Sequence, residues 1–169
     1  MKSIATFISF VFLSLSTFAQ GLFFETFNYG TNPGSIISLS GGKWVENTTA
    51  STTNIIQYNP AGSLLFPNCN AAGGRLNILN TGQDITSALS TSVSANNLYA
   101  AMLVNFSAAQ ATGDYFFAYL DSALSGTNYR ARTFIKTSGT GYKIGISKSG
   151  TVTAAGYYAT DLSFNTRAK

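Results

Sequence analysis

Few residues in this chain could do acid–base or metal chemistry. The 169 residues include six acids and no histidine. The lack of histidine excludes Ser-His-Asp and Cys-His catalysis, histidine metal sites and histidine acid–base steps. A glycosidase needs two carboxylates facing one sugar bond, and no two acids here lie at i, i+2 or i+4 on one strand face. We therefore expect no enzymatic activity.

Calcium is the one cofactor that these residues could hold. Ca²⁺ takes six to eight oxygen ligands, and the candidates are Glu25, Asn28 and Asp161. The alternative is that isolated acids on strands are solvated or hydrogen-bonded to turns. The single cysteine, Cys69, excludes an internal disulfide, and its turn-like surroundings favour a small, partly buried residue over a reactive thiol.

Carbohydrate binding is the most specific activity that the side chains suggest. Sugars stack on exposed aromatic faces, and the best candidates are Trp44, Tyr157 and Tyr158. Adjacent strand residues face opposite ways, so one of the two tyrosines should point outward. The alternative is that the aromatic residues fill a β-sheet core, as they commonly do.

The basic residues are sparse. The formal net charge is +4 from ten basic and six acidic residues, which is too little for the dense basic stripe that nucleic acid requires. Arg130, Arg132, Lys136 and Lys143 could share the outer face of one hairpin and bind an anionic glycan. The alternative is that they solubilise an exposed face and protect a sheet edge.

The first residues are typical of an export signal. Lys2 gives a positive start, residues 4–18 are mainly apolar, and Thr17-Phe18-Ala19 is an acceptable cleavage site, with Ala19 last in the leader. The apolar stretch is shorter than the ~20 residues that span a bilayer, and no later segment approaches that length. We expect a signal peptide over residues 1–19, one domain over 20–169, and a secreted or cell-surface protein.

The remaining chain is patterned as short β-strands. Turn signals recur every 8–12 residues, and no helical periodicity extends over ten or more residues. Strands are expected over residues 21–27, 43–46, 55–58, 63–66, 75–79, 84–89, 98–106, 114–120, 129–136, 142–147 and 151–153. Residues 98–106 are nearly all apolar, which predicts a central strand covered on both faces. The fold class is therefore all-β, an antiparallel sandwich of two sheets.

The order of several weak motifs resembles a known domain. The motifs are Leu22 to Tyr29, Gly42-Lys43-Trp44, Gly82-Gln83-Asp84, Tyr99 to Leu120, Arg130-Ala131-Arg132 and Gly145 to Lys148. Together they resemble the concanavalin A-like (LamG-like) jelly-roll domain of secreted Bacteroidota proteins. The resemblance implies a module of a long cell-surface protein with a type IX sorting domain. It also implies a further apolar strand after Thr166, so we expect this chain to be a fragment that lacks its final strand.

Two functions follow as expectations. The first is an exported, non-enzymatic β-sandwich with a structural or adhesive role. The second is a carbohydrate-binding module for an extracellular polysaccharide.

Overall fold

The computed structural model describes most of the chain after the expected leader. The described residues are 21–47, 51–65, 67, 73–79, 81–95, 97–121 and 126–165. Ala19 and Cys69 lie outside them. No helix in this part of the chain is long and apolar enough to cross a membrane.

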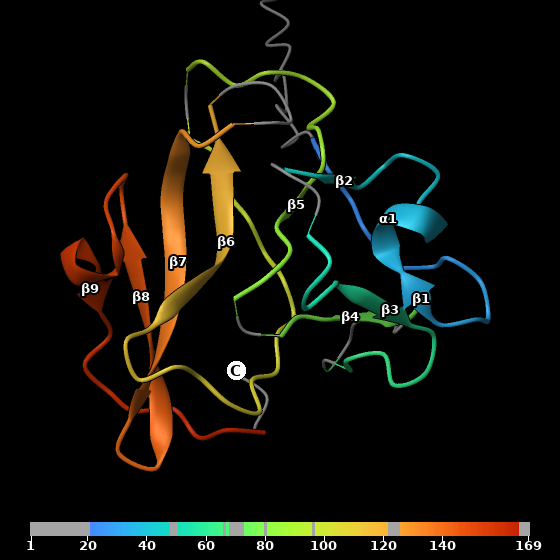
Figure 1. Ribbon diagram of the computed structural model, residues 1–169. Coiled ribbons are helices and arrows are strands. Elements are labelled where there is room, and N and C mark those ends of the chain that lie inside the picture. The colour runs from blue at the N-terminus through green and yellow to red at the C-terminus, as the bar shows by residue number, and fades with distance from the viewer. Residues whose placement is uncertain are drawn as a thin grey trace, which may run out of the picture.

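The architecture is antiparallel β with very little helix (Figure 1). A four-stranded sheet has the order β6-β7-β8-β9, and two small sheets have the orders β1-β3-β4 and β2-β5. The all-β class expected from the sequence is therefore confirmed. The strands are β1 (Gly34–Ser35), β2 (Val45–Glu46), β3 (Gln57–Asn59), β4 (Arg75–Asn77), β5 (Ile85–Thr86), β6 (Asp114–Leu120), β7 (Tyr129–Ser138), β8 (Gly141–Ser147) and β9 (Gly156–Tyr157); α1 is Ile36–Leu39, and Val152–Ala154 forms a 3₁₀ turn.

The longest strands form where alternation and turn chemistry agree. β7 and β8 make a hairpin in which Ser138 pairs with Gly141. Gly139 turns the chain with a φ of +56°, a conformation that glycine adopts at little cost. β6 pairs with the other edge of β7, and this pairing contains two register shifts. Ala131 in β7 also has a positive φ of +48°, so the strand does not keep a strict two-residue alternation.

A compact apolar cluster stabilises the N-terminal half. Ile36, Ile56 and Tyr58 are its fully enclosed members, and the Tyr58 hydroxyl donates to the Gly30 carbonyl at 2.8 Å. Burial of such side chains contributes roughly 1.5–3 kcal/mol each. Partly buried side chains pack around them, namely Phe27, Tyr29, Ile37, Leu39, Trp44, Leu76 and Ile85.

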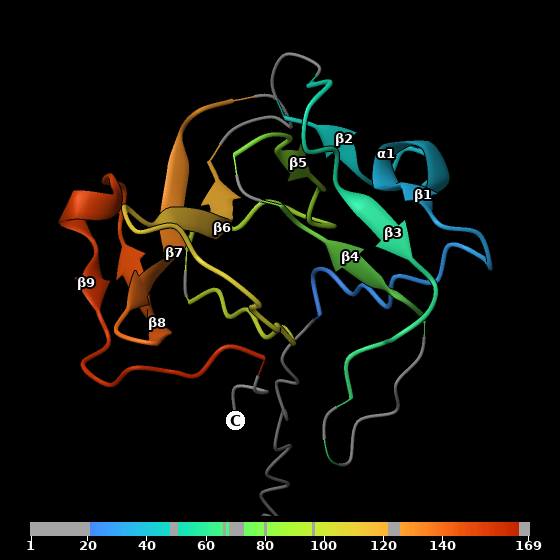
Figure 2. The ribbon, with the colours of Figure 1, turned by 60° about the horizontal axis from the view of Figure 1, so that its bottom comes forward.

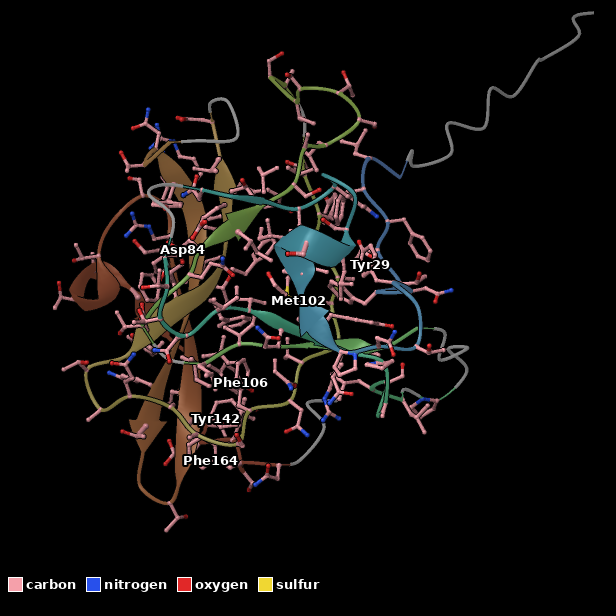
Figure 3. All side chains as sticks on the ribbon, turned by 45° about the vertical axis from the view of Figure 1, so that its right-hand side comes forward. Tyr29, Asp84, Met102, Phe106, Tyr142 and Phe164 are labelled. Atoms are coloured by element: carbon pink, nitrogen blue, oxygen red, sulfur yellow. The ribbon has the colours of Figure 1, made fainter. Side chains whose placement is uncertain are left out.

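A second cluster of aromatic rings lies on the four-stranded sheet (Figure 3). The Phe106 ring centre is 4.9 Å from that of Phe116 and 5.2 Å from that of Tyr142. Phe164 contacts the Tyr142 ring at 5.3 Å. Next to it, Tyr142 and Leu162 exchange two backbone hydrogen bonds of 2.8 Å. The chain after β9 is thereby held on the edge of β8.

Some expected strands do not form. Residues 21–27 form no strand, and Phe27 at their end has a φ of +50°, which interrupts an extended chain. Residues 63–65 and 98–106 are assigned to no strand, and the last two residues of the expected 151–153 strand lie in the 3₁₀ turn. Alternating or apolar residues favour a strand, but pairing also needs a neighbour at hydrogen-bonding distance.

The two groups of strands are joined by polar contacts. In Figure 2 the four-stranded sheet lies on the left and strands β1 to β5 on the right. Asn47, which follows β2, donates to the Gly126 carbonyl at 3.1 Å and to the Tyr129 hydroxyl at 2.6 Å. Tyr115 in β6 donates to Asp84 at 2.6 Å. These bonds hold β2 and β5 against the start of β7 and β6.

Candidate functional site

The carboxylate of Glu25 is the centre of a polar cluster in the N-terminal half. It accepts hydrogen bonds from the backbone N–H of Phe27 at 2.6 Å, the Tyr29 hydroxyl at 2.5 Å and the Trp44 indole N–H at 3.1 Å. Lys43 forms an ion pair with it at 2.9 Å. The Glu25 side chain is only 8% exposed. Both of its oxygens are therefore occupied by donors from this chain.

Burial and hydrogen bonding oppose each other at Glu25. Burial by itself raises the pKa of the Glu25 carboxyl, but the hydrogen bonds to its ionised form outweigh burial, so this pKa lies below its ordinary value of 4.5. Burial raises the pKa of the Tyr29 hydroxyl, and its hydrogen bond to Glu25 raises this pKa further. The cluster consequently favours a charged glutamate and a neutral tyrosine.

Trp44, expected as a sugar platform, lies inside this cluster. Its ring stacks on Phe27 with ring centres 6.1 Å apart and meets Phe23 edge to face at 5.7 Å. Trp44 is partly buried against the apolar cluster around Ile36. Its indole N–H is bonded to Glu25, so one face and the polar edge of the ring are used within the chain.

The three expected calcium ligands have different surroundings. Glu25 is enclosed as described, Asn28 is exposed, and Asp161 pairs with Lys143 at 3.5 Å. Within the described ranges no group of three or more His, Cys, Asp or Glu residues is placed to hold a metal ion.

The cations of the β7–β8 hairpin each have their own partner. Arg130 pairs with Asp121, and Lys143 pairs with Asp161. The Lys136 ammonium lies 3.9 Å from the centre of the Tyr157 ring, a cation–π contact.

Arg132 lies between two tyrosine rings. Its guanidinium is 4.5 Å from the Tyr129 ring centre and 5.2 Å from that of Tyr115. The Nε atom of Arg132 is buried, with no hydrogen-bond partner among the residues described. Lys136 and Lys143 lie directly opposite each other in the pairing of β7 with β8, so these two cations share one face of the sheet.

Tyr157 and Tyr158 have different surroundings. The Tyr157 ring covers Gly145 so closely that a methyl group added there would lie 2.6 Å from its Cδ1 atom. Tyr158 is 63% exposed, and only its backbone is fixed, by a bond from its N–H to the Ile144 carbonyl at 2.9 Å. Of the three predicted aromatic residues, Tyr158 has the ring most available to a ligand.

A small cleft between the segment that leads into β5 and the start of β6 was not expected from the sequence. Its volume is about 190 Å³, and Asp84 and Asp114 both line it. Tyr115 joins the two acids, because its hydroxyl donates to Asp84 and its N–H donates to Asp114 at 2.8 Å. Burial, followed by the bond to Asp84, raises the pKa of Tyr115. The other lining residues are Ile78, Leu79, Thr81, Gly82 and Gln83.

These two acids are 30 positions apart in the sequence, so spacing along one strand could not bring them together. A usable signal was the composition of their neighbours. Asp84 follows Gly82-Gln83 and Asp114 follows Gly113, and glycine and aspartate are typical of the turns that connect strands.

Comparisons with protein-family models, with curated proteins and with solved structures each found no match to the chain. The resemblance to a concanavalin A-like domain therefore remains a prediction from the sequence.

Proposed function

We propose that this chain is an exported, non-enzymatic β-sandwich module with a structural or adhesive role outside the cytoplasm. The observation that carries the proposal is that polar and aromatic side chains of this domain contact one another. Glu25 and Trp44 bind each other, Arg132 lies between two tyrosines, and Lys136 covers Tyr157. Side chains that bind one another in this way stabilise the domain and are not free to contact a ligand.

The sandwich architecture is part of the same proposal. Antiparallel strands in separate sheets on two sides of the molecule (Figure 1) support it, as does the enclosed apolar cluster of the N-terminal half. The jelly-roll order of strands is expected from the sequence resemblance alone. Export rests on the pattern of residues 1–19, and the intact mass of the secreted protein tests it. A product that begins after Ala19 supports export, and a product that retains Met1 contradicts it.

A glycan array tests the structural role. We expect the purified chain to bind no polysaccharide, and we expect Trp44→Ala to lower the unfolding temperature. The matched variant is Tyr158→Ala, which removes an exposed ring and should leave that temperature unchanged. Binding to a polysaccharide that Tyr158→Ala abolishes would contradict the structural proposal.

Carbohydrate binding is the second candidate, and the cleft lined by Asp84 and Asp114 favours it. The cleft combines carboxylates and a hydroxyl with the exposed side chains of Ile78 and Leu79. Sugar sites use such a mixture of polar groups and apolar surface. If this candidate is right, Asp114→Asn should abolish binding on the array while Asp161→Asn leaves it intact. Hydrolysis of a bound glycan would contradict the non-enzymatic part of both proposals.

A further inference from the structure

Residues 98–105 form a largely exposed segment that pairs with no strand in the described part of the chain. Tyr99 is 83% exposed and Met102 is 45% exposed, and Leu103 is similarly accessible. The hydrogen bonds that join described residues include none to the backbone of 98–105. In Figures 1 and 2 this yellow-green stretch passes between the four-stranded sheet and β4 as a plain trace. A row of unpaired N–H and C=O groups is a template for another strand.

The segment is anchored rather than loose. At its end, the Phe106 ring contacts Phe116 and Tyr142, and the Phe106 carbonyl accepts a bond from the N–H of Asn165 at 2.8 Å. Figure 3 shows Phe106 beside Tyr142 and Phe164, whereas Met102 lies apart from them. The unpaired backbone therefore has a fixed point on the four-stranded sheet, which reduces the entropy that pairing would cost.

The segment lacks the features that usually prevent edge pairing. Natural edge strands carry lysine, proline or a bulge. Between Asp84 and Asp114 this sequence has no charged residue and no proline. Residues 98–105 could span roughly 26 Å when extended, which is the length of an ordinary strand.

We propose that residues 98–105 pair with the same residues of a second copy of this chain, as antiparallel strands about a two-fold axis. A two-fold interface places the same patch on both subunits. A patch without charge is complementary to itself, because neither copy brings a charge that the other must neutralise. Pairing centred on Met102 puts Ala101 opposite Leu103 and Ala100 opposite Val104, so each branched side chain meets a small one. This inference does not depend on the proposed function.

Sedimentation of the purified chain over a wide range of concentrations tests the pairing. We expect a monomer–dimer equilibrium. Met102→Lys should raise the dimer dissociation constant at least about tenfold, because it places two like charges directly opposite each other at the two-fold axis. The matched control is Ile146→Lys. Ile146 is 58% exposed, but its strand is already paired on both sides, so this variant should dimerise normally.

Hydrogen exchange of the unaltered chain provides a second measurement that needs no variant. We expect the amides of 98–105 to exchange more slowly as the protein concentration rises. A chain that stays monomeric at all concentrations would overturn the proposal. A dimer that Met102→Lys does not weaken, or exchange in 98–105 that is independent of concentration, would also overturn it. A heterologous complex formed through 98–105 without any dimer would identify another occupant and refute self-pairing.

Discussion

Replacing Glu25 by glutamine removes a charge and keeps the shape, so it isolates what the carboxylate contributes. One carboxylate oxygen accepts from the Phe27 N–H, and the other accepts from Tyr29, Trp44 and Lys43. An amide has one oxygen and one NH₂ group. If its oxygen faces the second set of donors, its NH₂ must face the Phe27 N–H, where two donors meet.

The expected cost follows from these contacts. A hydrogen bond to a charged group contributes about 1.5–3 kcal/mol. The Lys43 side chain is 39% exposed, so loss of the ion pair adds only about 0.5–1 kcal/mol. Glu25→Gln should therefore lower the free energy of unfolding by about 2–4 kcal/mol. For a domain of this size that corresponds to a fall in the unfolding temperature of about 5–15 °C.

Acid should narrow the difference in the free energy of unfolding between Glu25→Gln and the unaltered protein. The pKa of Glu25 is lower in the folded state than its ordinary value of 4.5, so below that pH the unfolded chain binds more protons. The stability that Glu25 contributes is present above pH 4.5 and is lost as the pH falls through the folded pKa. Between neutral pH and pH 3, the unfolding temperature of the unaltered protein should fall more steeply than that of Glu25→Gln.

The control is Asp161→Asn, the same chemical change at a half-exposed ion pair. Lys143 is 3.5 Å from Asp161, and such pairs contribute about 0–1 kcal/mol. The account of the Glu25 cluster is wrong if Glu25→Gln lowers the free energy of unfolding no more than Asp161→Asn does. It is also wrong if the unfolding temperature of Glu25→Gln falls with pH as steeply as that of the unaltered protein.

Two further predictions concern close packing and a buried amide. Gly145→Ala should lower the free energy of unfolding by about 1–3 kcal/mol, because the new methyl group would lie 2.6 Å from the Tyr157 ring; Gly156→Ala, which meets nothing within 4 Å, should be close to neutral, and equal effects in denaturant titrations would contradict the packing described. Asn47 is 1% exposed and bonded to the start of β7, so Asn47→Ala should cost about 1–3 kcal/mol. Asn28→Ala, at an exposed position outside residues 98–105, should change calorimetric stability little, and the reverse order of the two would refute the role given to Asn47.

The sequence predicted the C-terminal hairpins well because their signals are local. β6 has the expected bounds, and β7 and β8 extend the expected strands by one or two residues. Alternating residues on both sides of a glycine turn define the register with little help from the rest of the chain. No comparable signal marks the positive φ of Ala131, which depends on the pairing of β7 with both of its neighbours.

The strands that failed to form needed distant partners. The apolar run at 98–106 indicates a buried strand when considered alone, but whether it is buried depends on which backbone lies beside it. The Glu25 cluster was missed for a related reason. Its members come from two separate stretches of chain, around residues 25–29 and 43–44. One usable signal was that a partly buried tryptophan N–H needs an acceptor, and the chain has few acids to supply it.

The polar junction between the two groups of strands has a consequence for cooperativity. No strand of the β1–β5 group pairs with a strand of the β6–β9 group in the described part of the chain, and the junction includes the bonds of Asn47 and Asp84. Urea solvates peptide groups as well as apolar ones, and among the described residues no ladder of backbone hydrogen bonds between strands crosses this junction. The molecule should therefore divide into two foldons. Native-state hydrogen exchange would then report two isotherms, one for each side of the junction.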